Sequence, residues 1–200
     1  MRPRPGIAVR TVGALALLAT TGTGFAVVPS PPRTGADAVL LMAVRSGEVL
    51  AEYNPDRRHP PASLTKLMTA YVTFRALERD RINPGDRVRI GERTWRLEGS
   101  QMFLEVDERV PVRKLLAGMI VASGNDAARA LAGHVGGSVD AFVTRMNRQA
   151  ERLGLTRTHF ANPSGMPAPG MHTTARDMAR LSAALWRRFP QRYALFARKE

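Results

Sequence analysis

Residues 63–77 have the apolar pattern of a buried helix and also contain two polar side chains that such a helix does not need for packing. Apolar residues recur at the i, i+3, i+4, i+7 and i+8 spacing of a buried helix, and they are Leu64, Leu67, Met68, Tyr71, Val72 and, less regularly, Leu77. Ser63 begins this pattern and Lys66 follows three residues later. Residues three apart share a helix face, so the helix would hold a hydroxyl beside an amine.

Ser63 and Lys66 have the chemistry of a nucleophile and its base. A serine hydroxyl attacks weakly until a base removes its proton. Apolar neighbours would partly desolvate Lys66, so we predict a lowered pKa and a neutral amine that can accept that proton. The three lysines and eight serines of this chain would give only about 0.1 such pairs by chance. The competing interpretation is a surface lysine on an ordinary amphipathic helix.

Composition and charge limit the classes of function. A chain of 200 residues with 44% hydrophobic residues is typical of one globular domain. The net charge of +13 favours an anionic partner, but the arginines are scattered along the chain, so we predict no nucleic-acid binding. Without cysteine there are no disulfides or thiolate metal sites. The histidines, His59, His134, His159 and His172, lack the spacing of metal ligands, and we predict no metal and no cofactor.

The N-terminus has the three zones of a secretory signal peptide. Arginines precede an apolar run over residues 12–19, and small residues follow it. We predict a signal peptide over residues 1–26, with 38 as the latest boundary, and a linker over residues 27–37. The run is shorter than the roughly 20 apolar residues that a membrane span needs, so we favour export over an uncleaved anchor.

Short-range patterns predict most of the remaining elements. Two β-prone runs, residues 39–44 and 49–53, flank a glycine-containing turn and indicate a hairpin. Residues 82–111 are rich in turns, with one short strand near residues 87–90 and an ordered loop before the next helix. Helices are predicted from Pro111 to Ile120, over residues 139–153, and from Thr174 to about Phe189. We expect Trp95, Met102 and Phe103 to be packing residues.

A second polar group, Ser123-Gly124-Asn125-Asp126, follows the helix that begins at Pro111. Glycine among polar residues between two helical patterns indicates a tight turn, which would project Ser123 and Asn125 from one short loop. Ser-x-Asn alone is a weak signal, and Asp126 as a helix N-cap would explain part of the loop structurally.

Together, the two motifs resemble the first two motifs of the low-molecular-mass penicillin-binding proteins, the D-alanyl-D-alanine carboxypeptidases. Five collinear segments carry the resemblance, and they are residues 46–50, 62–69, 123–128, 153–165 and 174–179. Five segments in order are far more specific than either motif alone. The resemblance implies an α/β fold of the α+β type, similar to β-lactamases and penicillin-binding proteins. It would comprise a helical subdomain and the N-terminal β-hairpin of an incomplete antiparallel sheet.

The resemblance also implies a mechanism, with Ser63, Lys66 and Ser123 as catalytic residues and Asn125 as a substrate-binding residue. Ser63 would attack a terminal D-Ala-D-Ala peptide bond, and its backbone N–H would form half of the oxyanion hole. Lys66 would take the proton of Ser63, and Ser123 would help to pass it to the leaving amine. Asn125 would bind the substrate amide and place Lys66.

The implied partners are peptidoglycan stem peptides ending in D-Ala-D-Ala, and β-lactams that mimic them. The implied location is exported, periplasmic or otherwise extracytoplasmic, and associated with the cell wall. Association with the outer face of the membrane is a further expectation.

The superfamily that contains the penicillin-binding proteins and the β-lactamases has a third motif, Lys-Thr-Gly. This motif does not occur in the sequence. It is expected about a hundred residues beyond the second motif, near residue 225. We therefore expect residues 38–200 to correspond to the N-terminal part of a catalytic domain, and we expect the 200-residue chain to hydrolyse D-Ala-D-Ala poorly or not at all. The alternatives are a non-catalytic cationic fragment that binds cell wall, and a D,D-endopeptidase. A class A β-lactamase is disfavoured because the second motif is Ser-Gly-Asn and no glutamate suited to deacylation follows it.

Overall fold

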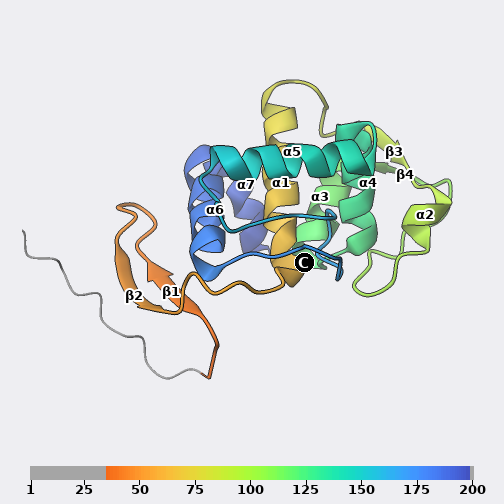
Figure 1. The fold of residues 1–200 in the computed structure, drawn as a ribbon. Coiled ribbons are helices and arrows are strands. Elements are labelled where there is room, and N and C mark those ends of the chain that lie inside the picture. The colour runs from red at the N-terminus through yellow and green to blue at the C-terminus, as the bar shows by residue number, and fades with distance from the viewer. Residues whose placement is uncertain (1–34, 199–200) are drawn as a thin grey trace, which may run out of the picture.

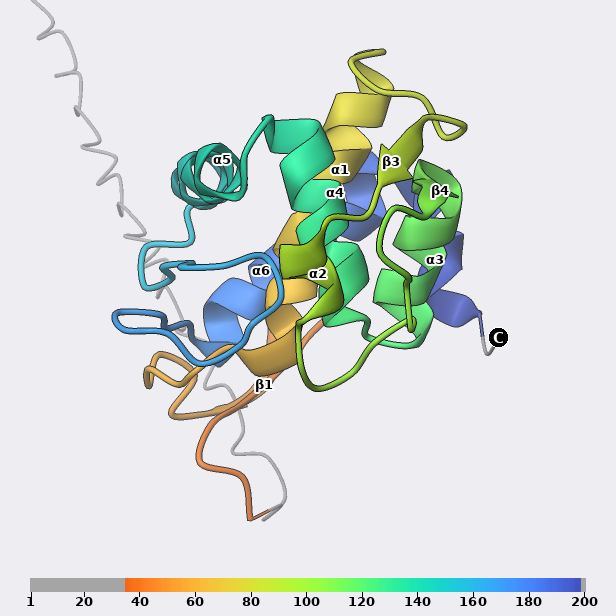
Figure 2. The ribbon, with the colours of Figure 1, turned by 90° about the vertical axis from the view of Figure 1, so that its right-hand side faces the viewer.

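A computed structural model describes residues 35–198 as a group of helices around one central helix, with a β-hairpin at one end (Figures 1 and 2). The central helix is α1, Thr65–Glu78, and a 3-10 turn, Ala62–Leu64, precedes it. The other helices are α2 (Glu92–Trp95), α3 (Val112–Val121), α4 (Asn125–Gly136), α5 (Val139–Arg152), α6 (Ala175–Arg188) and α7 (Pro190–Tyr193), and a 3-10 turn, Ala194–Ala197, follows. Helix α1 contacts α3, α4, α5 and α6.

The apolar stripe predicted for α1 is too narrow, because this helix is buried on nearly all sides. Met68 and Phe74 are fully buried, but so are Thr69 and Thr73, whereas Leu64 is 52% exposed. The Thr69 hydroxyl donates to the Pro163 carbonyl at 2.6 Å, and the Thr73 hydroxyl donates to the Thr69 carbonyl at 2.8 Å. Buried hydroxyl groups are tolerated when they are hydrogen-bonded, so α1 can hold polar groups in the core.

The predicted hairpin is confirmed. Strands β1 (Val39–Met42) and β2 (Val49–Tyr53) pair antiparallel, and Gly47 in their turn has φ +79°, which favours glycine. Leu41, Leu50 and Tyr53 are exposed on the hairpin. Helix α6 contacts β1. The fold class expected from the sequence, helices with an N-terminal antiparallel hairpin, is therefore observed.

A second pair of strands corrects the prediction for residues 105–111. Strand β3, Arg87–Arg89, was expected, but it pairs with β4, Arg109–Pro111, in a segment predicted to be a loop. Three-residue strands are too short for a periodic pattern. Pro111 has extended backbone angles and is the N-cap of α3 rather than its first residue. The short helix α2 was not predicted either.

The expectation that Trp95 and Phe103 pack in the core is wrong, and the contacts of Asp126 explain the exposure of Phe103. The Asp126 carboxylate accepts from the backbone N–H groups of Met102, at 2.9 Å, and Leu104, at 3.4 Å. Met102 packs on the core and Leu104 is buried, whereas Phe103 between them is 84% exposed with φ +58°. Trp95 is 51% exposed. Asp126 is not a helix N-cap, because Gly124 occupies that position.

The last two long helices begin as their sequences predict. The Ser138 hydroxyl accepts from the Ala141 N–H at 3.1 Å at the start of α5, and the Thr174 hydroxyl accepts from the Asp177 N–H at 3.1 Å at the start of α6. The Asp177 carboxylate accepts from the Arg157 N–H and the Thr158 hydroxyl. It therefore ties α6 to the preceding loop.

None of the helices within residues 35–198 combines the length and the apolar character needed to cross a membrane. The predicted signal peptide, residues 1–26, and most of the predicted linker, residues 27–37, lie outside the described residues.

Replacing the cap of α5 should test the role of local sequence in the fold. Ser138→Ala removes the acceptor for the Ala141 N–H, and we expect it to lower the free energy of unfolding by about 1 kcal/mol. Ser138→Asp keeps a capping oxygen and should remain close to the unchanged chain. Urea denaturation followed by circular dichroism measures both. Equal losses in the two variants would contradict a capping role.

Candidate active site

Four polar side chains from distant parts of the sequence meet at the start of α1. Ser63 lies in the 3-10 turn and Lys66 in the first turn of α1, where the Lys66 Nζ is 3.4 Å from the Ser63 Oγ. Ser123, in the turn between α3 and α4, directs its hydroxyl to the Ser63 Oγ at 3.2 Å. Asn125, the first residue of α4, accepts from the Lys66 Nζ at 2.9 Å. The structure thus brings together all four site residues expected from the sequence.

The Lys66 amine is buried, although the serine beside it is open to solvent. The Lys66 residue is 6% exposed, and its Nζ donates to the Asn125 Oδ1 and to the Ser164 carbonyl, both at 2.9 Å. Within the described chain, no carboxylate forms an ion pair with this amine. Burial lowers the pKa of Lys66, because desolvation disfavours the charged amine. The direction predicted from the sequence is confirmed.

Sequence reasoning missed the Ser164 carbonyl as a partner of Lys66. The Asn162 Oδ1 shapes this segment, because it accepts from the N–H groups of Ser164, at 3.1 Å, and Gly165, at 2.7 Å. Gly165 has φ +91°, and a Cβ added there would lie 1.8 Å from the Ala62 carbonyl oxygen. Only glycine allows this approach to the turn that carries Ser63. The Asn-Pro-Ser-Gly sequence signals such a turn but not its partner.

Asn125 is fixed at both ends of its side-chain amide. Its Oδ1 accepts from Lys66, and its Nδ2 donates to the Glu98 carbonyl at 2.8 Å and lies 3.4 Å from the Met166 Sδ. The backbone N–H of Asn125 donates to the Ser100 carbonyl at 2.7 Å. Methionine sulfur is a weak acceptor, so one N–H of this amide can turn to a ligand without breaking a strong hydrogen bond.

Two residues at the site have strained backbone angles. Ala62, directly before Ser63, has φ +45°, and Ser123 has φ +55°. A non-glycine residue in the left-handed region costs about 1–3 kcal/mol and persists only where its surroundings enforce it. The two strained residues flank or carry the serine hydroxyl groups, which lie 3.2 Å apart.

Ser63, Lys66 and Ser123 line a cavity of about 630 Å³. Its remaining lining is mostly apolar, and consists of Pro60, Pro61, Ala62, Leu64, Leu67, Met119, Ile120 and Phe196. A concave apolar site with a few polar groups is typical of a small-ligand site. The arrangement can therefore hold an extended organic substrate against a serine hydroxyl that has an amine and a second hydroxyl within reach.

The described part of the chain contains no candidate metal-binding site. No group of three or more histidine, cysteine, aspartate or glutamate residues within residues 35–198 is placed to hold a metal ion. His159 and His172 instead stack on each other, and their backbones form a bridge.

Comparison with known proteins identifies the family. The family described as D-alanyl-D-alanine carboxypeptidase matches residues 26–200. D-alanyl-D-alanine carboxypeptidase DacC from Escherichia coli is 44% identical over 192 residues, which is 93% of this chain and 48% of that protein. The D-alanyl-D-alanine endopeptidase from the same species is 28% identical over 167 residues, which is 83% of this chain and 52% of that protein.

A solved structure agrees with the sequence comparison. Penicillin-binding protein 5 from Haemophilus influenzae has a TM-score of 0.83 and 42% identity, over 86% of this chain and 51% of that one. The penicillin-binding-protein-like fold expected from the motifs is thus confirmed. The chain spans about half the length of the curated relatives it matches. On this evidence the chain belongs to the D-alanyl-D-alanine carboxypeptidase family.

Proposed function

We propose that this protein is a serine-type D-Ala-D-Ala carboxypeptidase that acts on peptidoglycan stem peptides through an acyl-enzyme. One observation carries the proposal. The Ser63 Oγ lies 3.4 Å from the Lys66 Nζ and 3.2 Å from the Ser123 Oγ, at the wall of a cavity that is open to a substrate. A nucleophile within hydrogen-bond reach of its base, with a second group that orients the proton, is the arrangement that covalent catalysis needs.

The hydrogen bonds of Lys66 favour its role as the base. A neutral amine has two hydrogens and one lone pair. The Asn125 Oδ1 and the Ser164 carbonyl are both acceptors at 2.9 Å, so they would take the two hydrogens. The lone pair would then face the remaining neighbour, the Ser63 hydroxyl. The lowered pKa of Lys66 increases the neutral fraction that this geometry requires.

The proposed reaction has two balanced steps. The Ser63 Oγ bonds to the carbonyl carbon of the penultimate D-alanine, Lys66 takes the hydroxyl proton, and the backbone N–H of Ser63 supports the oxyanion. The C–N bond then breaks, and the proton passes through Ser123 to the nitrogen of the leaving D-alanine. Water attacks the ester, gives a proton to Lys66 and releases the shortened peptide as Ser63 regains its hydrogen. No metal or cofactor takes part in this scheme.

Asn125 would bind the substrate as well as place Lys66. A substrate carbonyl that replaces the Met166 Sδ would accept from the Asn125 Nδ2 and improve a weak contact. β-Lactams would acylate Ser63 in the same position. We place the protein outside the cytoplasm, at the cell wall and with contact to the outer face of the membrane, on the strength of the predicted signal peptide and the expected substrate.

The carboxypeptidase assignment is favoured over the endopeptidase because the relative named a carboxypeptidase is 44% identical and the one named an endopeptidase is 28% identical. The absence of Lys-Ser-Gly or Lys-Thr-Gly from the sequence still matters for rate. The resemblance assigns to that motif the lysine that meets the substrate carboxylate and the second oxyanion N–H. We therefore expect this 200-residue chain to acylate more readily than it turns over.

Labelling with a fluorescent penicillin should separate the catalytic proposal from a non-catalytic cell-wall-binding fragment. We expect the unchanged chain to be labelled and Ser63→Ala to lose the label, because the ester cannot form. Lys66→Met should slow labelling by about 10²-fold or more, since general-base catalysis is lost. Ser46→Ala, in the exposed hairpin turn, is the matched control. Absence of label from the unchanged chain, or its retention in Ser63→Ala, would reject the proposal.

Turnover should be weak in the same preparation. Incubation with diacetylated Lys-D-Ala-D-Ala should release D-alanine slowly or not at all, because these 200 residues do not contain the motif to which the resemblance assigns the carboxylate-binding lysine and the second oxyanion N–H. A coupled D-amino-acid oxidase assay measures the release. Robust release would show that the third motif is not needed for turnover.

The lowered pKa of Lys66 predicts a pH dependence of stability. Lys66 is neutral in both states above about 10.5 and charged in both below its lowered pKa. Between these values the unfolded chain binds more protons, so the free energy of unfolding rises with pH. We expect Lys66→Met to remove this rise and exposed Lys114→Met to retain it. Urea denaturation from pH 7 to 10 measures the slopes, and equal slopes in the two variants would contradict the assignment.

A further inference from the structure

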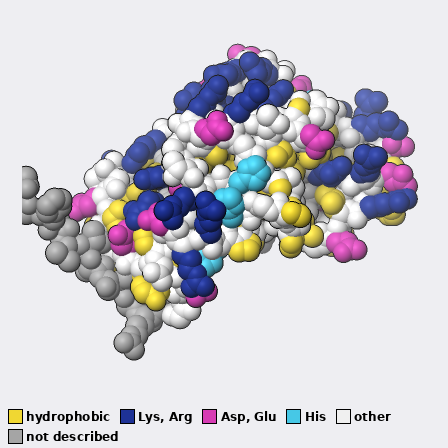
Figure 3. All heavy atoms as spheres, viewed as in Figure 1, with side chains coloured by type: hydrophobic (Ala, Val, Ile, Leu, Met, Phe, Trp, Pro, Cys, Tyr) yellow, Lys and Arg dark blue, Asp and Glu magenta, His cyan; other side chains and the backbone are white. Residues whose placement is uncertain are grey.

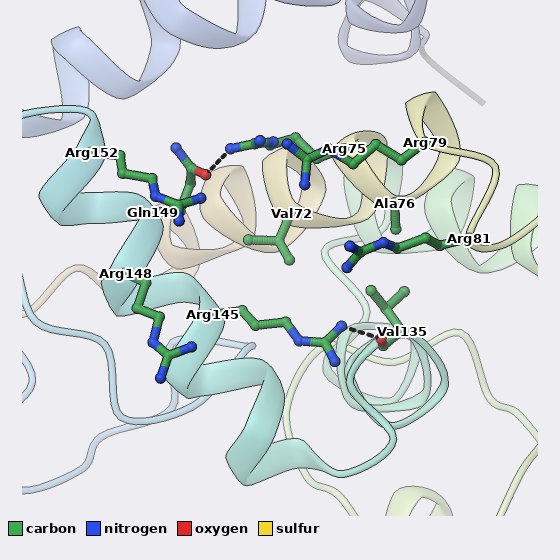
Figure 4. Close-up of a pocket in the computed structure, with 10 residues that line it drawn as sticks. All are labelled: Val72, Arg75, Ala76, Arg79, Arg81, Val135, Arg145, Arg148, Gln149 and Arg152. Carbon is green, nitrogen blue, oxygen red and sulfur yellow. Dashed lines mark hydrogen bonds between the residues drawn. The ribbon is translucent and has the colours of Figure 1, made fainter.

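Six arginines that are scattered in the sequence surround one cavity of about 280 Å³ beside α1 and α5 (Figure 4). We call this cavity the arginine groove, and its arginines are Arg75, Arg79, Arg81, Arg145, Arg148 and Arg152. Figure 3 shows Lys and Arg side chains gathered along the top of the molecule, over α5 and the C-terminal end of α1 as placed in Figure 1. The arginines are scattered along the sequence, and the fold brings some of them together.

The arginines of the groove are not paired with acids in the described part of the chain. No aspartate or glutamate lines the groove. Within residues 35–198, none of its six guanidinium groups forms an ion pair, whereas Arg176 pairs with Glu52 and Asp56. Glu78, near the end of α1, pairs with Arg188 outside the groove. Like charges held this close repel one another, so the groove favours an anion.

Two arginines form the floor of the groove, and both are hydrogen-bonded to neutral partners. Arg75 donates to the buried Gln149 side chain. Arg145 donates to the carbonyls of Val135, at 2.7 Å, and Gly136, at 3.2 Å, at the end of α4. Burial, and then the charges of Arg79 and other neighbouring arginines, lower the pKa of Arg75. These contacts fix the orientation of Arg75 and Arg145 but leave their positive charges unbalanced.

The other four arginines form a rim that is free to bind. Arg79, Arg81, Arg148 and Arg152 are exposed, and none of their side chains forms a hydrogen bond within the described part of the chain. Figure 4 shows Arg152 and Arg81 reaching toward the groove from opposite sides of Val72. Their guanidinium groups leave many N–H donors facing a common space.

The groove is separate from the candidate active site. Arg79 follows Lys66 by thirteen residues along α1, and a rise of about 1.5 Å per residue puts roughly 20 Å between them. Ser63 lies at one end of α1 and the groove lies at the other. A ligand in the groove would leave the cavity at Ser63 open.

We propose that the arginine groove binds a phosphate group, either free in solution as a phosphate or pyrophosphate, or carried by the headgroup of an anionic lipid. Planar guanidinium groups bind phosphate through paired N–H···O bonds, and phosphate offers enough oxygens for several arginines at once. A multivalent anion would also offset the positive charge of the groove, because no carboxylate lines it. If the headgroup is the source, the groove end of α1 faces the bilayer and Ser63 faces away from it.

Two triple variants of the 200-residue chain test the proposal. The groove variant is Arg79→Gln, Arg148→Gln and Arg152→Gln, and the control variant is Arg58→Gln, Arg113→Gln and Arg198→Gln, which changes exposed arginines outside the groove. Both variants lose three positive charges, so they separate a local site from net charge. Circular dichroism and thermal melting establish that both fold, and labelling of Ser63 with penicillin should be unchanged in both.

Isothermal titration with pyrophosphate is the first measurement. We expect the groove variant to bind at least about tenfold more weakly than the unchanged chain, because several charge-assisted hydrogen bonds are lost. The control variant should stay within about twofold of the unchanged chain, because its substitutions leave those bonds in place.

Sedimentation with vesicles of phosphatidylcholine, with and without phosphatidylglycerol, is the second measurement, and it identifies the source. Phosphatidylglycerol-dependent binding that only the groove variant loses assigns the site to a lipid headgroup. Groove-dependent binding of pyrophosphate without vesicle binding assigns it to a soluble phosphate. Equal behaviour of the two triple variants with both probes, or binding of neither probe by the unchanged chain, would overturn the proposal.

Discussion

The burial of one amine is the constraint on which the site depends. Lys66 lies in the core of the helical part, 6% exposed, where a charge without a paired carboxylate is costly. Its partners are an amide oxygen from α4 and the Ser164 carbonyl. Those two contacts connect three segments of the chain and leave Ser63 as the third neighbour of the amine. The same burial lowers the pKa of Lys66, and in the proposed mechanism the two acceptors leave the lone pair of the neutral amine toward Ser63.

The two ends of α1 have opposite chemical requirements. Its N-terminal end holds Ser63 beside a buried amine at an apolar cavity, where the positive end of the helix dipole suits a developing anion. Its C-terminal end carries Arg75 and Arg79, where cations complement the negative end of the helix dipole. Helix dipoles explain one or two arginines at that end, but they do not explain arginines from α5 that face the same cavity.

The loop over residues 98–104 shows how one buried side chain can replace regular structure. Asp126 accepts from two alternate backbone N–H groups, which directs Met102 and Leu104 inward and Phe103 outward. The next residue toward the site, Asn125, binds the carbonyls of Glu98 and Ser100 through its side chain and backbone. Hydrogen bonds between segments more than twenty residues apart hold this loop. The hydrophobic periodicity of the sequence does not predict such bonds.

The sequence by itself determined what depends on neighbours a few residues away. The β1–β2 hairpin, the starts of α5 and α6, and the pairing of Ser63 with Lys66 on one helical turn follow from turn residues, caps and the 3.6-residue period. The motifs also identified the family. Only the tertiary structure decided which distant groups meet. The Ser164 carbonyl on Lys66, the β3–β4 pair, the exposure of Phe103 and the arginine groove all arise where packing brings remote segments together. Such contacts leave no periodic signal in the local sequence, because a backbone carbonyl or a single arginine is chemically the same wherever the chain places it.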